Sequence, residues 1–248
     1  MANRTTLADA LHQAEHLAEA ETAFHEAEEM QKKNRPEFPL LYSLRGFRYC
    51  DLLLSQGKVQ EVVHRAEQTL EWYKKYGATS LHDIAIYNLS IGRAHLLQSQ
   101  REPNHPFTES LTYLNRAVDG LRQANDQEYI ACGLLARAEY YRVTGALDKA
   151  QKDLDEAFTI ATRGGMGLFL ADCHLGYARL FMSLRGGALP TKQPPDGKEI
   201  ASSQSALLAT TYKNAREHLK TAKEMIEKMG YHRRDKEVEE LGKEIENR

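Results

Sequence analysis

One spacing of small and large side chains recurs along the chain. In four segments a small residue is followed four positions later by a large one and three positions after that by alanine: Ala20, Phe24 and Ala27; Ser110, Leu114 and Ala117; Ala150, Leu154 and Ala157; and Ala215, Leu219 and Ala222. Residues spaced in this way share one face of an α-helix. Small side chains let two helix axes approach to about 8 Å, and the large one fills the space between them. The pattern therefore predicts helices that pack closely through these faces.

Residue preferences indicate that the whole chain is helical. Leucine occurs 31 times, against 6 valines and 8 isoleucines, whereas strands favour β-branched side chains. Proline is excluded from helix interiors, where it costs about 3 kcal/mol. The seven prolines gather in three places that we therefore expect to be connections: Pro36 and Pro39; Pro103 and Pro106; and Pro190, Pro194 and Pro195. The sequence predicts an all-α fold.

The segments between helix-breaking residues predict five helix hairpins and a final helix. The hairpins cover approximately residues 3–34, 38–76, 80–125, 128–164 and 166–230, and the second of them carries a degenerate copy of the pattern, with Val62, Ala66 and Thr69. Neither helix of a hairpin buries its apolar stripe alone, so the hairpins must stack on one another. Residues 233–247 have a single narrow apolar stripe, Val238, Leu241 and Ile245, which is typical of a helix that caps such a stack.

The small, large, small spacing, with a glycine or alanine earlier in each unit, resembles the tetratricopeptide repeat. The units are longer than the usual repeat of about 34 residues, and the phrases LLYSLRGFRYCDLLL and GYHRRD look like those in repeat tails of bacterial signal-transduction ATPases. The resemblance spans nearly the whole chain and implies a right-handed α-solenoid forming a single domain over residues 1–248. It specifies architecture better than activity.

Composition narrows the function classes. The formal net charge is -2, from 33 basic and 35 acidic residues, so we expect no binding to nucleic acid. No apolar run approaches the roughly 18 residues that span a membrane. Three cysteines without a C-x-x-C pair favour the reducing cytoplasm over a disulfide framework. Residues 186–205, rich in Gly, Pro, Ser and Lys, predict a flexible loop inside the fifth hairpin.

One short match to a metal motif needs a structural test. His12, Glu15 and His16 spell H-x-x-E-H, a signature of some zinc metalloproteases. That chemistry needs both histidines on one face of a continuous helix. The repeat pattern instead places the turn of the first hairpin near Glu15, where such repeats often have glycine. We therefore interpret the stretch as a turn, and a zinc hydrolase is the least favoured function.

The favoured function is a non-catalytic scaffold, adaptor or sensor that binds a peptide or partner protein along the concave side of the stack and regulates an effector, such as an ATPase or a protease. Neither a catalytic constellation nor a cofactor is expected. First helices line the concave side of such stacks, and arginine and tyrosine are frequent interface anchors. The predicted partner-binding residues are Arg48, Asp51, Arg93, Glu139, Tyr141, Arg142, Tyr177 and Arg179. The alternative is a receptor for a small molecule or a signalling peptide.

Overall fold

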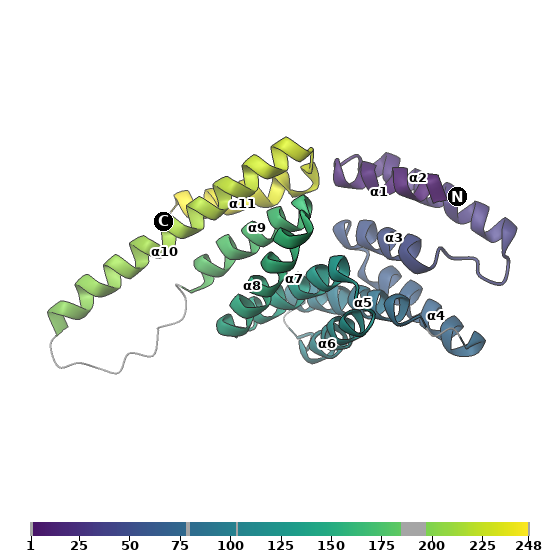
Figure 1. The fold of residues 1–248 in the computed structure, drawn as a ribbon, viewed down its shortest axis with the longest axis horizontal. Coiled ribbons are helices and arrows are strands. Elements are labelled where there is room, and N and C mark those ends of the chain that lie inside the picture. Colours follow the sequence, from purple (N-terminus) through teal and green to yellow (C-terminus); the bar gives the residue numbers. More distant parts are fainter. Residues whose placement is uncertain (1, 78–79, 103, 185–196, 248) are drawn as a thin grey trace. The chain divides into compact units, whose positions relative to one another are not determined.

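The computed structural model describes residues 2–77, 80–102, 104–184 and 197–247, with the backbone alone for 197–209. These residues form helices and no strand, so the all-α prediction is confirmed (Figure 1). The chain divides into two compact units, Met1–Arg137 and Ala138–Arg248, with the boundary inside one helix. No helix in the described ranges combines the length and apolar character needed to cross a membrane.

The first unit is built from helix hairpins. Its helices are α1 (Ala2–Gln13), α2 (Leu17–Asn34), α3 (Ser43–Ser55), α4 (Val59–Tyr76), α5 (Leu81–Arg101), α6 (Thr108–Gln123) and the beginning of α7 (Gln127–Val143). Consecutive helices pack in the pairs α1 with α2, α3 with α4 and α5 with α6. The first helices of these pairs also pack on one another, α1 on α3 and α3 on α5. They therefore form a continuous layer within this unit.

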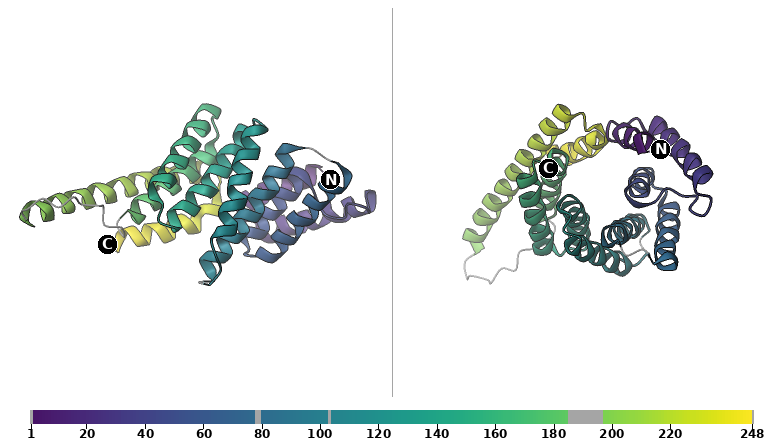
Figure 2. Two further views of the ribbon diagram at one scale, coloured as in Figure 1. Left: turned by 90° about the horizontal axis from the view of Figure 1, so that it is seen from below. Right: turned by 45° about the vertical axis from the view of Figure 1, so that its right-hand side comes forward.

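The second unit is also built from packed helices. It holds the end of α7, then α8 (Leu147–Gly164), α9 (Gly167–Ser183), α10 (Gly197–Met229), a short 3-10 helix (His232–Arg234) and α11 (Asp235–Glu246). Helix α9 packs against both α8 and α10 (Figure 2). Helix α11 buries Val238, Leu241 and Ile245, the stripe identified in the sequence, against α9 and α10. This buried stripe fixes the last helix on the preceding hairpin.

The repeated small residues occupy the close contacts between helices, as their spacing predicted. All eight are completely buried, with 0% exposure: Ala20, Ala27, Ser110, Ala117, Ala150, Ala157, Ala215 and Ala222. Glycines of the first helices receive the large residues. A Cβ atom built on Gly92 would lie 2.9 Å from Leu114, and one built on Gly176 would lie 2.6 Å from Leu154. A side chain at Gly92 would also come within 3.0 Å of the Leu114 backbone nitrogen and would therefore push α5 and α6 apart.

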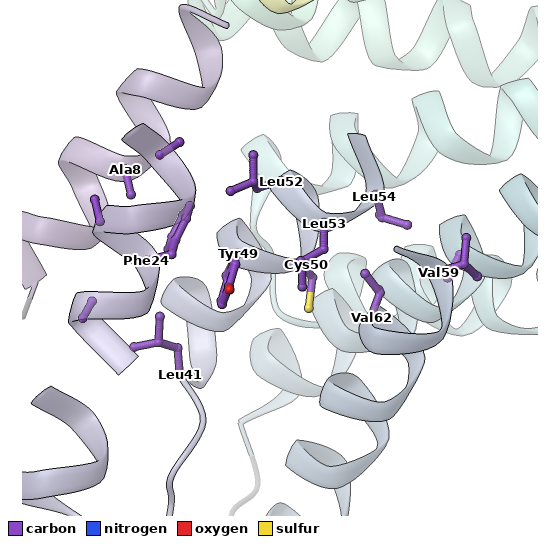
Figure 3. Packing of buried hydrophobic residues seen from close by; sticks show 14 residues of the cluster. Ala8, Phe24, Leu41, Tyr49, Cys50, Leu52, Leu53, Leu54, Val59 and Val62 are labelled. Atoms are coloured by element: carbon purple, nitrogen blue, oxygen red, sulfur yellow. The ribbon is translucent and has the colours of Figure 1, made fainter. Parts of the chain in front are cut away.

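The core of the first unit is continuous across two hairpins. The rings of Phe24 on α2 and Tyr49 on α3 stack with centroids 4.8 Å apart (Figure 3). Leu53 and Cys50 extend the same cluster towards Val62 of α4. Since the side chains of one hairpin complete the core of the next, neither hairpin buries its apolar face alone.

Six helices end in one type of turn. In each, a residue with positive φ donates its N–H to the carbonyl three residues back, and the next residue donates five residues back; the positive-φ residues are Glu15, Gly57, Asn125, Gly145, Gly165 and Gly230. This is the Schellman motif, which glycine favours because the left-handed conformation strains a residue with a Cβ atom. Four of the six positions hold glycine. Glu15, with φ 65°, is the bulkiest exception.

One connection is shorter than predicted. The sequence predicts a flexible loop over residues 186–205, but the chain is helical from Gly197 as the start of α10. The prolines end at Pro195, and no breaker interrupts the chain between Gly197 and Met229, so the helix can extend back to that point. The part of the predicted loop at 186–196 lies outside the described residues.

Candidate functional site

Three of the eight predicted partner-binding residues join the first helices of the first unit. Arg93 on α5 donates to Asp51 on α3 at 2.6 Å, and Arg48 on α3 pairs with Asp9 on α1 at 3.2 Å. These four side chains are partly exposed, between 13% and 28%. The two ion pairs therefore run across the layer formed by α1, α3 and α5, on its accessible side. We call Asp9, Arg48, Asp51 and Arg93 the charged ladder.

Three further predicted residues lie at the end of α7. Arg142 holds Glu139 one turn away through two hydrogen bonds of 2.8 Å and donates to Ser183 of α9 at 2.9 Å. The neighbouring Tyr141 ring faces the ammonium of Lys149 at 5.5 Å. These contacts connect α7 to α8 and α9 within the second unit.

The last two predicted residues lie on α9. The Tyr177 hydroxyl donates to Asp155 of α8 at 2.7 Å, and Arg179 donates to Glu237 of α11 at 2.5 Å. Glu237 also accepts from Arg234, which in turn donates to Asp172 on α9. Burial raises the pKa of Glu237, but the two guanidinium groups outweigh it and lower the pKa to about 2. This network is an anchor for α11.

The structure thus joins three of the eight residues in the charged ladder of the first unit and places the other five at contacts between α7, α8, α9 and α11 in the second unit. Each group connects neighbouring helices, and the charged ladder is the one that spans three first helices. Sequence reasoning missed the partners Asp9, Asp172, Arg234 and Glu237. Opposite charges at matching places in successive first helices could have indicated these partners. They can be paired only once the register between hairpins is known. Their role in partner binding stays a prediction.

The H-x-x-E-H stretch is split by a turn, as the repeat pattern predicted. Helix α1 ends at Gln13 and α2 begins at Leu17, with Glu15 in the left-handed conformation between them. His12 is fully buried, with its Nε2 atom 3.2 Å from the Ser55 hydroxyl. His16 is exposed and pairs with Glu19 at 3.1 Å. The two histidines therefore do not share a helix face as the zinc motif requires.

Two of the cysteines are unsuited to nucleophilic chemistry at neutral pH. Cys50 and Cys173 are buried, and burial raises the pKa of each thiol to about 12. The thiolate is the reactive form of cysteine. These two side chains therefore serve as small apolar core residues.

A shallow apolar groove lies on the first hairpin, where no functional residue was predicted. It has a volume of about 600 Å³ and is lined by Asn3, Arg4, Leu7, Leu11, Ala18, Glu19, Thr22, Ala23 and Glu26. Leu7 is 56% exposed, the highest value among the large apolar residues described. Helix α1 buries Ala8 and His12 on one side, while Leu7 and Leu11 form a second apolar stripe one residue away. That second stripe is the signal by which the sequence could have revealed the groove.

Comparisons of this chain with protein-family models, with curated proteins and with solved structures found no match.

Proposed function

We propose that this chain is a non-catalytic interaction module, related in architecture to tetratricopeptide repeats, that binds an amphipathic helix of a partner protein. The resemblance is supported by the complete burial of the eight repeated small residues. The observation that carries the function is the groove between α1 and α2, with the exposed Leu7 beside the half-buried Leu11. Covering a leucine side chain contributes up to about 1.5–3 kcal/mol, so this stripe favours an apolar occupant.

The shape and charge of the groove favour a basic amphipathic helix as that occupant. Leu7 and Leu11 are four residues apart, which matches the ridge that a third helix inserts between two packed helices. Arg4 and Glu26 form an ion pair at the rim, and Glu19 adds a second exposed carboxylate. The rim therefore has an excess of negative charge, which complements lysine or arginine beside the apolar stripe of the partner. The partner is the effector that the module regulates.

Peptide selection tests the proposal directly. Helical peptides selected from a display library on the full chain should share an apolar stripe with basic flanks. Leu7→Glu should weaken their binding at least about tenfold, because a charge would be buried under the peptide. Leu81→Glu is the matched control, since Leu81 is 47% exposed on α5 and lies outside the groove. Equal binding to the wild type and to Leu7→Glu would refute the groove as the site.

The same assay separates the groove from the charged ladder. Arg93→Ala removes the ladder side chain predicted from the sequence. Glutamate at this position would face Asp51, which accepts from Arg93 at 2.6 Å, and would destabilise the fold through repulsion. Peptides that lose affinity for Arg93→Ala but not for Leu7→Glu would assign binding to the ladder. A small molecule bound at one per chain, seen by native mass spectrometry, would favour the receptor alternative.

A further inference from the structure

Two histidines and a glutamate converge where helix α5 meets the start of α6. His95 lies on α5, His105 lies in the connection, and Glu109 lies in the first turn of α6. One potential ligand atom of each lies within 4.8 Å of the other two, and the Nδ1 atom of His95 is 3.5 Å from a Glu109 oxygen. Two imidazoles and a carboxylate are the ligand set of many zinc sites.

His95 is held in place with a ring nitrogen available. Its ring lies between those of His105 and Tyr113, with both centroids 5.7 Å away and interplanar angles of 24° and 20°. The Nδ1 atom is buried and makes no hydrogen bond. A buried polar atom without a partner costs free energy that a metal ion could offset.

Ser99 fixes the tautomer of His105. The Ser99 hydroxyl lies 2.9 Å from the His95 carbonyl oxygen and 3.2 Å from that of Pro106, and both can only accept. When its single proton goes to one of these carbonyls, its oxygen accepts from the Nδ1–H of His105 at 3.1 Å. The proton on Nδ1 leaves the lone pair on Nε2 free. Hydrogen bonds of this kind orient the histidine ligands of metal sites.

We propose that the Nδ1 atom of His95, the Nε2 atom of His105 and the carboxylate of Glu109 bind one Zn²⁺ ion, with a fourth position open to water. Ligand atoms of a tetrahedral zinc site, each about 2.0–2.2 Å from the metal, lie roughly 3.3–3.5 Å apart. The His95 to Glu109 distance of 3.5 Å already fits. One ring nitrogen of His105 lies within 4.8 Å of the other two ligand atoms, and its Nε2 atom can be brought to the metal because Glu109 is 58% exposed and His105 lies outside the helices. Two nitrogen ligands favour zinc over calcium or magnesium.

Metal binding by the full chain, freed of any affinity tag and treated with a chelator, tests the site. Titration with zinc chloride followed by calorimetry should show one ion per chain, and zinc should raise the melting temperature. His105→Ala and Glu109→Gln should each weaken binding at least about tenfold and abolish the rise, while both proteins keep their helical circular dichroism. Ser99→Ala, which frees the His105 ring, should weaken binding about tenfold or more.

His16→Ala is the matched control. It removes an exposed histidine of the H-x-x-E-H stretch and should leave zinc affinity unchanged. Co²⁺ added in place of Zn²⁺ should show the visible absorption of a tetrahedral site when bound to the wild type or to His16→Ala, but not with His105→Ala. Three results would overturn the proposal: no zinc binding to the wild type, equal binding to His105→Ala and Glu109→Gln, or loss of binding in His16→Ala.

Discussion

Two groups of two histidines and one glutamate differ in how the fold treats them. His12, Glu15 and His16 are adjacent in the sequence, and a turn separates them between the buried end of α1 and the exposed start of α2. His95, His105 and Glu109 are spread over three segments, and the hairpin of α5 and α6 gathers them. The convergence of ligands is therefore a property of hairpin geometry and not of letter spacing.

The connections of the two hairpins explain this difference. Three residues join α1 to α2, and the turn at Glu15 lies between the buried His12 and the exposed His16. Six residues join α5 to α6, enough for His105 to lie against the His95 ring. The histidines also differ in their environment: the Nε2 atom of His12 lies 3.2 Å from the Ser55 hydroxyl, whereas the ring of His95 lies between those of His105 and Tyr113.

The largest effect on stability should come from separating α5 and α6, the hairpin that brings His95, His105 and Glu109 together. Gly92→Val on α5 would place a Cβ atom 2.9 Å from the Leu114 side chain and 3.0 Å from its backbone nitrogen on α6. We expect a loss of about 1–3 kcal/mol in the free energy of unfolding, measured with urea, because the core cannot accept the added volume. Zinc binding should weaken with it, since His95 and Glu109 lie on the two separated helices.

Gly242→Ala is the control for this substitution. A Cβ atom on Gly242 would meet nothing closer than 3.8 Å, so alanine should be neutral or stabilising in α11. A neutral result for Gly92→Val would show that α5 and α6 do not approach as closely as described.

The sequence predicted the helices and the turns because local rules govern both. Repeated small residues predicted which faces pack, prolines predicted connections, and the place of Glu15 in the repeat predicted a turn that the structure shows. The eight candidate residues were chosen for chemistry and expected helix face, but their ion-pair partners depend on which residues of different hairpins lie side by side. The Asp51 to Arg93 pair joins residues in two hairpins. The apolar periodicity within one helix does not reveal which residues of two different hairpins lie side by side.

The groove and the histidine cluster were missed for different reasons. Leu7 and Leu11 lie close to the stripe of Ala8 and His12, and the sequence does not say which stripe is covered. His105 lies beside two prolines in a connection, whose path follows no periodic rule. Spatial clusters of this kind become visible only from coordinates.

A third histidine group differs from both, because its two imidazoles bind each other. His174 on α9 and His218 on α10 lie 2.8 Å apart through their Nδ1 atoms, beside the rings of Tyr177 and Phe181. One imidazole must donate to the other, so double protonation breaks the bond. Burial lowers the pKa of both residues, and in His174 the neighbouring His218 lowers it further.

Stability should therefore fall in acid. In the unfolded chain these histidines take up protons as the pH falls through about 6.5, before the folded chain does. The free energy of unfolding should be flat above that pH and should fall below it, by at most about 1.4 kcal/mol per pH unit for each histidine. Melting curves at a series of pH values measure this slope. His218→Phe keeps a ring beside Phe181 and should reduce the slope, and an unchanged slope would assign the acid sensitivity to other groups.

The smallest effect should come from the turn that splits the H-x-x-E-H stretch. Glu15 adopts φ 65°, where a residue with a Cβ atom is strained by about 1–2 kcal/mol. Glycine removes the strain but loses more conformational entropy on folding. Glu15→Gly should therefore raise the free energy of unfolding by about 0.5–1 kcal/mol, as measured by urea denaturation. Glu15→Ala keeps the strain and should give no such gain. Glu15→Gly also removes the glutamate of the H-x-x-E-H motif. Because Glu15 is not one of the proposed ligands His95, His105 and Glu109, zinc affinity should be unchanged. A weaker affinity would place the metal at the first hairpin instead.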